Sequence, residues 1–485
     1  MHPDVFDLLV TAVAFPVAAI LLMLGIEDMT LDLTFFTGGW KRTNRCLSST
    51  ELRAVPKKRI AMIVPAWQES DVIDRMLENA MRTLDYDKDK LDIFVGTYPN
   101  DPATRAKVQE VEARIAAVHE CVVPHDGPTS KADCLNTVWN CILAYEREHD
   151  VHFDMLLMHD AEDVIHPLAL LHYNYLIPTY DFVQTPVLPL EVPLWELVAG
   201  TYFDEFGEFH LKDMIVRGQI RGLVPSAGVG SAFARAPFEE VARAHDNQPF
   251  DVESLTEDYE VGLKMRLAGK STHFACDWVE LDRTVGGRPV RELLATREYF
   301  PTGFRASIRQ RSRWICGIAF QAWERIGWQG PLPVVYSLYR DRRALLSHTI
   351  AMAAYAILLC CVARWGLGVW TGHPWSFTRV FAIGSALYVV VTLNLVFAVW
   401  RACVKVATLR RVYSWGHSLM SVVRSPIANV IGFLATASAA RQYLVHRITK
   451  KPLRWKKTAH QFPTGAFAMV PLPDAPAETR PSASA

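Results

Sequence analysis

Long apolar runs alternate with mixed segments along this chain, and they predict its membrane elements. Leu8 to Ile26 is nearly free of charge and long enough to cross a bilayer as one helix. It lacks a basic start and an Ala-x-Ala exit, so we interpret it as a retained anchor rather than a signal peptide. Ala344 to Val362 and Val380 to Trp400 are two further predicted spans, and the Trp-rich link between them is typical of a membrane interface.

Clusters of Lys and Arg flank the three predicted spans and indicate their orientation. One cluster follows the first span, and another follows the third span. A further cluster precedes the second span and contains Arg340, Arg342 and Arg343. The positive-inside rule places all of them in the cytosol. The N-terminus is therefore predicted to lie outside, and the large middle segment in the cytosol.

A fourth apolar stretch, Ile427 to Leu444, is interrupted by polar residues such as Asn429 and Gln442. If it crossed the membrane, the basic residues that follow it would lie outside, against the charge rule. It is therefore predicted to be an interfacial or re-entrant helix. The Pro-, Ala- and Ser-rich tail, 464–485, is predicted to be disordered.

The middle segment alternates short apolar runs with amphipathic stretches. This order predicts parallel βαβ units, hence an α/β fold whose ligands lie beyond the carboxyl ends of the strands. Further along, the pattern predicts a membrane-surface segment over 194–221, a glycine-rich turn, a helix capped by Thr256, and a basic amphipathic helix over 304–323. The predicted strands cover 59–65, 90–96 and 153–158, and the first predicted helices cover 69–81, 104–117 and 131–148.

Composition changes this picture little. Lys and Arg together number 51, as do Asp and Glu, so no nucleic-acid partner is expected. Hydrophobic residues make up 50% of the chain, which agrees with a membrane protein. The 9 Cys are scattered without Cys-x-x-Cys units, so neither a zinc ribbon nor a disulfide framework is indicated.

Three carboxylates follow the third predicted strand in the sequence Asp160-Ala161-Glu162-Asp163. In an extended segment Asp160 and Glu162 share one face and Asp163 points to the other. Two such carboxylates can hold Mg or Mn, whose shell substrate phosphates and water complete. The alternative, a strand followed by an acidic turn, is equally compatible with this segment alone.

The chain contains six short motifs in a fixed order. Each motif alone is common, but the whole ordered set is far more specific for one protein family. Together they resemble the family 2 inverting glycosyltransferases of the membrane-embedded, cellulose-synthase-like kind, over residues 58–325. The segments 95–101, 297–301 and 455–463 resemble more closely the phage adsorption protein B (NfrB-like) family. The motifs are Pro65-Ala66-Trp67-Gln68-Glu69, Asn100-Asp101, Lys131-Ala132-Asp133-Cys134-Leu135-Asn136, Asp160-Ala161-Glu162-Asp163, Thr256-Glu257-Asp258 and Gln310-Arg311-Ser312-Arg313-Trp314.

The resemblance implies a role for each matching residue on the donor side. Asp160 and Glu162 match the metal-binding Asp-x-Asp, with Mg or Mn bridging the diphosphate, although Glu at the second position is one methylene longer. Asp163 is expected to orient the sugar or its neighbours. The set expected to bind the nucleotide of a UDP-sugar is Pro65, Trp67, Glu69, Tyr98, Asp101 and Lys131.

The same resemblance assigns the acceptor side. Asp258 matches the catalytic base and Glu257 supports it. Gln310, Arg313 and Trp314 match the motif that closes on the donor diphosphate and the acceptor sugar. Gly230, in the glycine-rich turn, is expected to form part of the acceptor floor.

These expectations combine into a GT-A domain, an α/β fold with transmembrane and interfacial helices. The catalytic part covers 58–325, between an anchor with a basic linker, 1–57, and a membrane region, 326–463. The enzyme is expected in the bacterial inner membrane, using a UDP-N-acetylhexosamine to build a surface or secreted glycan, with an export partner protein completing the route.

Three alternatives stay open at the level of sequence. The first is a single transfer to a lipid acceptor, polyprenyl phosphate. The second is a metal-dependent phosphoesterase or nucleotidyltransferase built on the same acidic cluster, which gives no role to Asp258 or Trp314. The third is a non-catalytic membrane receptor component for phage, which gives no reason for the ordered acidic motifs.

Overall fold

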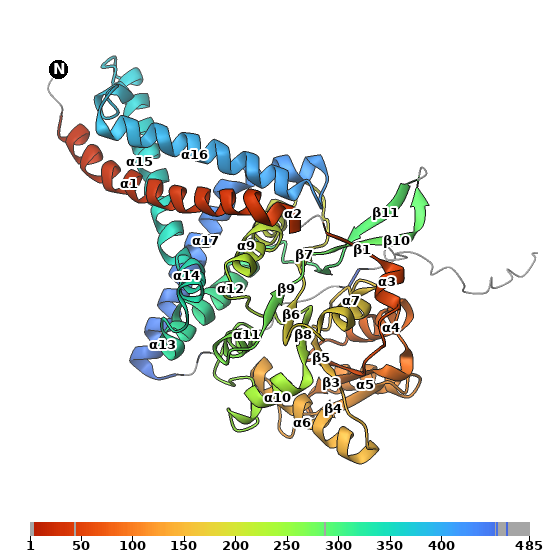
Figure 1. The fold of residues 1–485 in the computed structure, drawn as a ribbon. Coiled ribbons are helices and arrows are strands. Elements are labelled where there is room, and N and C mark those ends of the chain that lie inside the picture. The colour runs from red at the N-terminus through yellow and green to blue at the C-terminus, as the bar shows by residue number, and fades with distance from the viewer. Residues whose placement is uncertain (1–3, 43–44, 286–287, 452, 454–461, 464–485) are drawn as a thin grey trace, which may run out of the picture.

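The computed structural model describes residues 4–42, 45–285, 288–451, 453 and 462–463. Within them, an α/β domain lies beside a group of long helices (Figure 1). The predicted disordered tail, 464–485, and most of the segment 455–463 lie outside the described residues.

A seven-stranded sheet forms the centre of the α/β domain, in the order β4-β3-β2-β5-β8-β6-β9. The strands β2 to β5 are parallel, as predicted, but β8 is antiparallel to both of its neighbours, so the sheet is mixed. The strands β4, β6, β8 and β9 are too short to give a clear pattern in the sequence. The bounds are β2 (Ile60–Pro65), β3 (Leu91–Thr97), β4 (Val118–Val122), β5 (Met155–Met158), β6 (Phe182–Gln184), β8 (Ser231–Ala234) and β9 (Thr272–Phe274).

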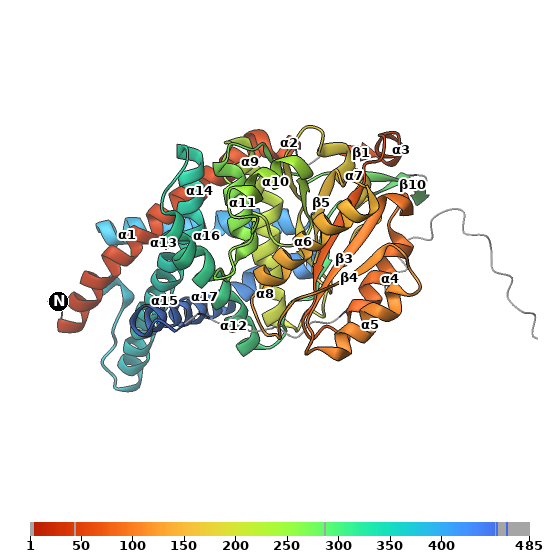
Figure 2. The same ribbon diagram turned by 90° about the horizontal axis from the view of Figure 1, so that it is seen from below.

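Both faces of the sheet are buried. On β2, Met62 and Val64 join one hydrophobic cluster, whereas Ala61 and Ile63 join another. This explains why the strand is an uninterrupted apolar run rather than an alternating one. The helices over the two faces are visible in Figure 2; they are α4 (Ile73–Thr83), α5 (Pro102–Glu112), α6 (Lys131–His149), α7 (Ala169–Leu176), α10 (Arg235–Arg243) and α11 (Glu257–Leu267).

Two small sheets complete the domain. In one, β1 (Cys46–Ser48) pairs with β10 (Trp278–Val285), which pairs with β11 (Arg288–Leu293). In the other, β7 (Val187–Pro189) pairs with β12 (Thr296–Glu298). The predicted linker thus contributes a strand to the domain, and the division of the chain into four parts stays a prediction.

In the part of the chain that the structure describes, four helices are long and apolar enough to cross a membrane: α1 (Val5–Thr34), with its continuation to Gly39, α15 (Ala344–Trp370), α16 (Ala386–Leu409) and α17 (Trp415–Thr449). The re-entrant alternative for 427–444 is wrong, because α17 is continuous; an interfacial position stays a prediction. Two of its polar side chains bond to neighbouring helices. Asn429 donates to the Tyr355 hydroxyl at 2.7 Å, and Gln442 donates to Ser312 Oγ at 2.7 Å.

Shorter helices connect the long ones to the domain. The predicted helix over 304–323 is confirmed as α12 (Phe304–Ile315), a π-helical turn (Cys316–Gln321) and α13 (Ala322–Ile326). The predicted surface segment forms α8 (Leu197–Glu208), a second π-helical turn (Phe209–Asp213) and α9 (Met214–Gln219), and α14 (Leu332–Arg342) leads to α15. The remaining short elements are η1 (Phe35–Gly39), α2 (Trp40–Arg42), α3 (Ser49–Arg53), η2 (Lys88–Lys90) and η5 (Phe377–Arg379).

A group of ion pairs, which we call the charged belt, joins these connecting helices to α1. Lys212 and Arg401 both contact Asp32, at 2.5 and 2.8 Å. Arg340 contacts Glu27 at 2.7 Å. The members of the belt are Glu27, Asp28, Asp32, Glu208, Lys212, Asp213, Arg340, Arg343 and Arg401.

Candidate active site

A pocket lies where β2, β3 and β5 end, at the carboxyl edge of the parallel strands. It brings together seven of the residues that the sequence predicted for the donor side, while Asp101 and Asp163 do not line it. The lining residues are Pro65, Ala66, Trp67, Glu69, Tyr98, Thr129, Ser130, Lys131, Cys134, Asp160, Ala161 and Glu162.

An aromatic pair forms one wall of this pocket. The Trp67 and Tyr98 rings meet edge to face, with centroids 5.0 Å apart. A side chain at Gly127 would place its Cβ 2.6 Å from the Trp67 ring, so only glycine allows this loop to cover the indole. Asn100 holds the loop, since its Nδ2 donates to Gly127 O at 2.7 Å and its Oδ1 accepts from Gly127 N at 2.8 Å. The indole is thereby fixed before any ligand binds.

Asp101 is placed differently from its expected role. Its buried carboxylate accepts hydrogen bonds from the backbone N–H groups of Gln68, at 2.5 Å, and Thr104, at 3.4 Å. It therefore caps α5 and fixes the loop that carries Trp67. The same loop delays the start of α4 from the predicted residue 69 to Ile73, because Gln68 adopts a left-handed φ of 57°. Contact between Asp101 and a nucleotide stays a prediction.

Lys131 is the cation of the pocket. It is the first residue of α6, where Ser130 caps the helix by accepting from Asp133 N at 3.3 Å. Its Nζ lies 2.5 Å from Asp160 Oδ1. Burial lowers the pKa of Lys131, but the carboxylates of Asp160, Glu257 and Asp258 raise that pKa by more, so the amine stays protonated. A helix N-terminus with a buried ammonium group suits a phosphate ligand.

The acidic segment after β5 is a turn rather than an extended strand, because Asp163 N donates to Asp160 O at 3.3 Å. The argument that alternate residues share one face is therefore wrong, although Asp160 and Glu162 both reach the pocket. Asp163 is fully buried and accepts from Asp160 N at 3.1 Å. Its other contact is with His159 Nδ1, at 2.6 Å, so both residues support Asp160 from behind.

These residues could hold a divalent cation only with help from a substrate. Among the residues that the structure describes, no group of three or more His, Cys, Asp or Glu side chains is arranged to hold a metal ion. Asp160 and Glu162 nevertheless provide two carboxylates to one pocket. This donor set fits Mg or Mn, which often take one or two carboxylates and complete their shell with phosphate and water.

Glu257 and Asp258 begin α11, close enough to Lys131 to influence its pKa. Burial, and then the neighbouring Asp258, raise the pKa of Glu257 to about 7. Burial also raises the pKa of Asp258 above its ordinary value, even though Lys131 lies near. The side-chain cap expected from Thr256 is wrong: its hydroxyl is buried without a hydrogen-bond partner in the described chain, because the π-helical turn packs Gly317 against it.

The glycine-rich turn stands behind Asp258. Gly228 has a φ of 78°, and an added Cβ would lie 2.6 Å from Asp258 Oδ2, so this position requires glycine. Gly230 lies deeper, with a φ of 59° and the hydroxyls of Thr185 and Thr296 against the position of its missing side chain. The expected role of Gly230 at the acceptor therefore stays a prediction, and Gly228 is the glycine that contacts the expected base.

The Gln310 motif faces the same region from α12. Gln310 Oε1 accepts from the Tyr202 hydroxyl at 2.7 Å. Arg313 Nη1 donates to Leu255 O at 3.4 Å, just before Glu257. Trp314 meets the Tyr202 ring edge on, with centroids 6.3 Å apart. The motif thus lies beside the residues that begin α11.

Sequence reasoning missed the aromatic layer under this motif. Tyr202 stacks on Phe300 with centroids 4.6 Å apart, and the Arg311 guanidinium lies 3.7 Å from the centre of the Tyr202 ring. The only signal was the aromatic-rich segment 194–221, which was assigned to the membrane surface. Its partner residues lie about a hundred positions away, so the pattern alone could not locate the contact.

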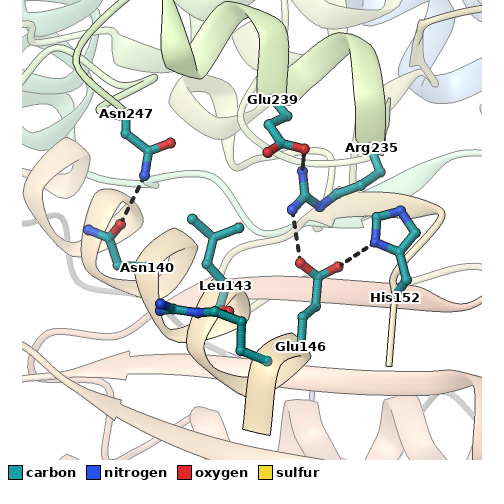
Figure 3. Close-up of a pocket in the computed structure, with 8 residues that line it drawn as sticks. Asn140, Leu143, Glu146, His152, Arg235, Glu239 and Asn247 are labelled. Atoms are coloured by element: carbon teal, nitrogen blue, oxygen red, sulfur yellow. Dashed lines mark hydrogen bonds and ion pairs between the residues drawn. The ribbon is translucent and has the colours of Figure 1, made fainter. Parts of the chain in front are cut away.

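A second hollow, of about 500 Å³, lies between α6 and α10 (Figure 3). It is at the opposite edge of the sheet, because His152 precedes β5 and Arg235 follows the antiparallel β8. Arg235 pairs with Glu146 and Glu239, each at 2.8 Å. None of the predicted site residues lies there, and the paired charges make it part of the framework.

Comparison with known proteins was made for sequence and for structure. The sequence profile described as "Glycosyltransferase like family 2" matches residues 56–317. Bacteriophage adsorption protein B of Escherichia coli (strain K12) is 36% identical over 465 residues, which are 93% of this chain and 62% of that protein. Bacteriophage N4 adsorption protein B of Escherichia coli O157:H7 gives the same values. The chain therefore spans less than two thirds of the length of these relatives.

Two solved structures illustrate the structural likeness. Mannosyltransferase PcManGT from Pyrobaculum calidifontis, in complex with GDP-Man and Mn2+, has a TM-score of 0.47 at 14% identity, covering 87% of this chain and 99% of that one. TarS 1-349 from S. aureus, in complex with UDP-GlcNAc, has a TM-score of 0.35 at 11% identity, covering 84% of this chain and 97% of that one. Assignment to a family rests on the sequence match.

Proposed function

Because this chain belongs to the family described as glycosyltransferase like family 2, and is a homologue of phage adsorption protein B, we propose that it transfers a sugar from a UDP-N-acetylhexosamine to a growing glycan. Its α/β domain is of the GT-A-like kind. The observation that carries the proposal is one pocket that holds an aromatic pair, a partly buried lysine and two carboxylates next to the acidic pair Glu257 and Asp258. These groups suit a uracil ring, a diphosphate and a divalent cation, respectively.

The donor would be held by residues that are already fixed. Trp67 offers an aromatic face for the base, and Lys131 offers an ammonium group to the diphosphate. Asp160 and Glu162 would hold Mg or Mn, which would stabilise the departing diphosphate as a Lewis acid.

The transfer step would use the acidic pair at α11. Asp258 would take the proton from an acceptor hydroxyl while that oxygen forms a bond to the anomeric carbon and the bond to the diphosphate breaks. The raised pKa of Asp258 makes it a better proton acceptor than an ordinary aspartate. Since attack comes from the face opposite the leaving group, the anomeric configuration inverts. Trp314 and Gln310 would hold the acceptor sugar.

The location follows from the long helices. The candidate spans would place the protein in a bacterial inner membrane, with the N-terminus outside and the catalytic domain in the cytosol. The product would be a surface or secreted glycan, exported with a partner protein. Because the chain covers only 62% of its named relatives, a role in phage adsorption remains a proposal about a larger protein.

Sugar transfer can be tested with membranes that contain the full chain, Mn2+ and radiolabelled UDP-sugars, followed by sizing of the product. We expect a polymeric product that UDP-N-acetylhexosamine supports and other UDP-sugars do not. A single lipid-linked sugar would contradict polymer synthesis and support the polyprenyl phosphate acceptor. Nucleotide hydrolysis alone, with no transfer, would support the phosphoesterase alternative.

The assignment of the base is tested by Asp258→Asn, with exposed Glu253→Gln as the matched control. We expect the transfer rate to fall by about 10²–10⁴-fold in the first variant and to be unchanged in the second. Binding of UDP should persist in both. Full activity of Asp258→Asn would rule out Asp258 as the base, and unchanged phenotypes of Asp258→Asn and Asp160→Ala would support a non-catalytic receptor.

A further inference from the structure

Four consecutive charged residues, 340–343, join α14 to the candidate span α15. Arg340, Asp341 and Arg343 each pair with oppositely charged side chains. Arg342 differs from them. Its side chain is only 4% exposed, and none of its three guanidinium nitrogens has a hydrogen-bond partner among the described residues.

A buried guanidinium without an anion is unfavourable, because arginine stays charged and the lost hydration is not replaced by hydrogen bonds. The neighbouring Asp341 favours the charge from a distance, but it pairs with Arg217, and the groups in contact with the guanidinium are two indoles. The Arg342 Cζ lies 4.4 Å from the centre of the Trp328 ring and 5.4 Å from that of Trp323. Such contacts leave the five N–H donors unused. The residue is therefore equipped to bind an anion.

The surroundings of Arg342 are those of a membrane surface. Trp323 and Trp328 are 42% and 44% exposed, and Leu332, at the start of α14, is 80% exposed. Exposed indoles next to the end of a span typically lie at the level of the lipid headgroups. The helix α13, which carries Trp323, and the helix α14, which carries Leu332 and Arg342, lie side by side in both ribbon views (Figures 1 and 2).

The loop that carries Trp328 connects α13 to α14 and contains two glycines, Gly327 and Gly330, with positive φ values of 68° and 109°. A Cβ at Gly327 would have no neighbour within 4 Å, whereas one at Gly330 would lie 2.9 Å from Val334 Cγ1. The loop is therefore open beside Gly327 and packed at Gly330. Trp328 covers the guanidinium from this loop, so an anion reaches the N–H groups when the indole shifts.

We propose that Arg342, together with Trp323 and Trp328, binds the headgroup phosphate of an anionic phospholipid at the membrane surface. The guanidinium donates two parallel hydrogen bonds to phosphate oxygens. The indoles lie against the glycerol and upper acyl region. This site is separate from the nucleotide pocket and does not depend on the proposed sugar transfer.

The test uses the full chain in nanodiscs of phosphatidylcholine alone or of phosphatidylcholine with phosphatidylglycerol. The melting temperature of the unmodified protein should rise when phosphatidylglycerol is present. Arg342→Met should lose this rise, while being at least as stable as the unmodified protein in phosphatidylcholine, because it removes an unpaired buried charge. Native mass spectrometry should show phosphatidylglycerol retained by the unmodified chain and lost by Arg342→Met.

The matched control is Arg305→Met, which removes an exposed arginine on α12 and should keep the full rise. A rise that persists in Arg342→Met, or that disappears equally in Arg305→Met, would overturn the proposal. The same holds if phosphatidylglycerol has no effect on the unmodified chain. If inorganic phosphate reproduces the rise in phosphatidylcholine nanodiscs, the site binds a free anion and the lipid assignment is wrong.

Discussion

The candidate active site and the charged belt each contain a lysine paired with an aspartate, but they balance its charge in opposite ways. Lys131 and Lys212 each lie 2.5 Å from an aspartate. In the belt, arginines accompany the acidic residues, and each carboxylate of α1 has more than one basic partner. In the site, three carboxylates, Asp160, Glu257 and Asp258, act on the single ammonium group of Lys131.

This difference separates a structural cluster from a binding cluster. The belt is complete as folded, so its ion pairs hold α1, α14 and α16 against the domain. The site holds more carboxylates than cations, and burial, followed by the neighbouring Asp258, raises the pKa of Glu257 although Lys131 and Arg313 lie near. A divalent cation would relieve that surplus, whereas the belt gains nothing from one.

Among the changes that compare the two clusters, the largest effect is expected from Lys131→Met. Loss of the ammonium group should reduce sugar transfer by about 10²–10³-fold, as for removal of one electrostatic stabiliser of a leaving group. It should also lower the melting temperature, because Asp160, Glu257 and Asp258 lose their cation, and Mn2+ should restore that temperature. Thermal scans with EDTA or Mn2+, together with transfer rates, measure both. If Mn2+ does not change the melting temperature of Lys131→Met, the proposed difference between the candidate site and the charged belt is wrong.

Lys212→Met is the counterpart in the belt. Breaking a buried ion pair should destabilise the protein by about 3–5 kcal/mol, because Asp32 and Glu208 keep their charges with fewer partners. The amount of folded protein in membranes and its melting temperature measure this loss. Transfer per folded molecule should be unchanged, and Mn2+ should give no rescue. If Lys212→Met loses transfer activity but keeps its normal melting temperature, Lys212 belongs to the catalytic machinery.

The acidic pair predicts a pH dependence of stability. In the folded state the pKa of Glu257 is about 7, above the ordinary value of 4.5. The protonated Glu257 therefore contributes fully to the stability of the folded state below pH 4.5, and this contribution is lost as the pH rises through 7. The loss amounts to at most about 3 kcal/mol. In EDTA, Glu257→Gln should flatten the fall in melting temperature between these pH values. If the melting temperature of Glu257→Gln falls as steeply as that of the unmodified protein, another titrating group causes the pH dependence.

The smallest effect is expected from Trp67→Ala. Removing the aromatic face should weaken UDP binding by about fivefold, in line with about 1 kcal/mol for one aromatic contact, while leaving the belt and the melting temperature nearly unchanged. Isothermal titration of UDP in the presence of Mn2+ measures the affinity. Trp195→Ala, at a side chain that is 78% exposed, is the matched control. If UDP binding weakens equally in both variants, Trp67 does not bind the base.

Much of the fold could be predicted from local patterns. The buried strands β2, β3 and β5 are continuous apolar runs, and α6 and α12 carry helical periodicity, so each is recognisable without its neighbours. The short strands β6 and β8 are not, because three or four residues carry no period. For the fourth long helix, predicted as interfacial or re-entrant, the re-entrant alternative is wrong, because the sequence does not show that Asn429 and Gln442 bond to Tyr355 and Ser312 of other helices.

The site shows the same division. The residue types and their order along the chain predicted which side chains would gather at the pocket, and Trp67, Glu69, Tyr98, Lys131, Asp160 and Glu162 are there. The sequence did not reveal that Asp101 caps a helix or that Asp163 is buried behind Asp160. It also could not indicate that Arg342, alone of four neighbouring charges, lacks an ionic partner.

By itself, then, the sequence determined the apolar runs, their lengths and the order of the chemical groups, because these depend on residues close together in the chain. The tertiary structure decided which charges meet. Tyr202 and Gln310 are 108 positions apart, yet they share a hydrogen bond, and Lys131 faces carboxylates from two distant segments. The balance of charge around a lysine depends on such contacts, so only the folded chain could distinguish the candidate site from the belt.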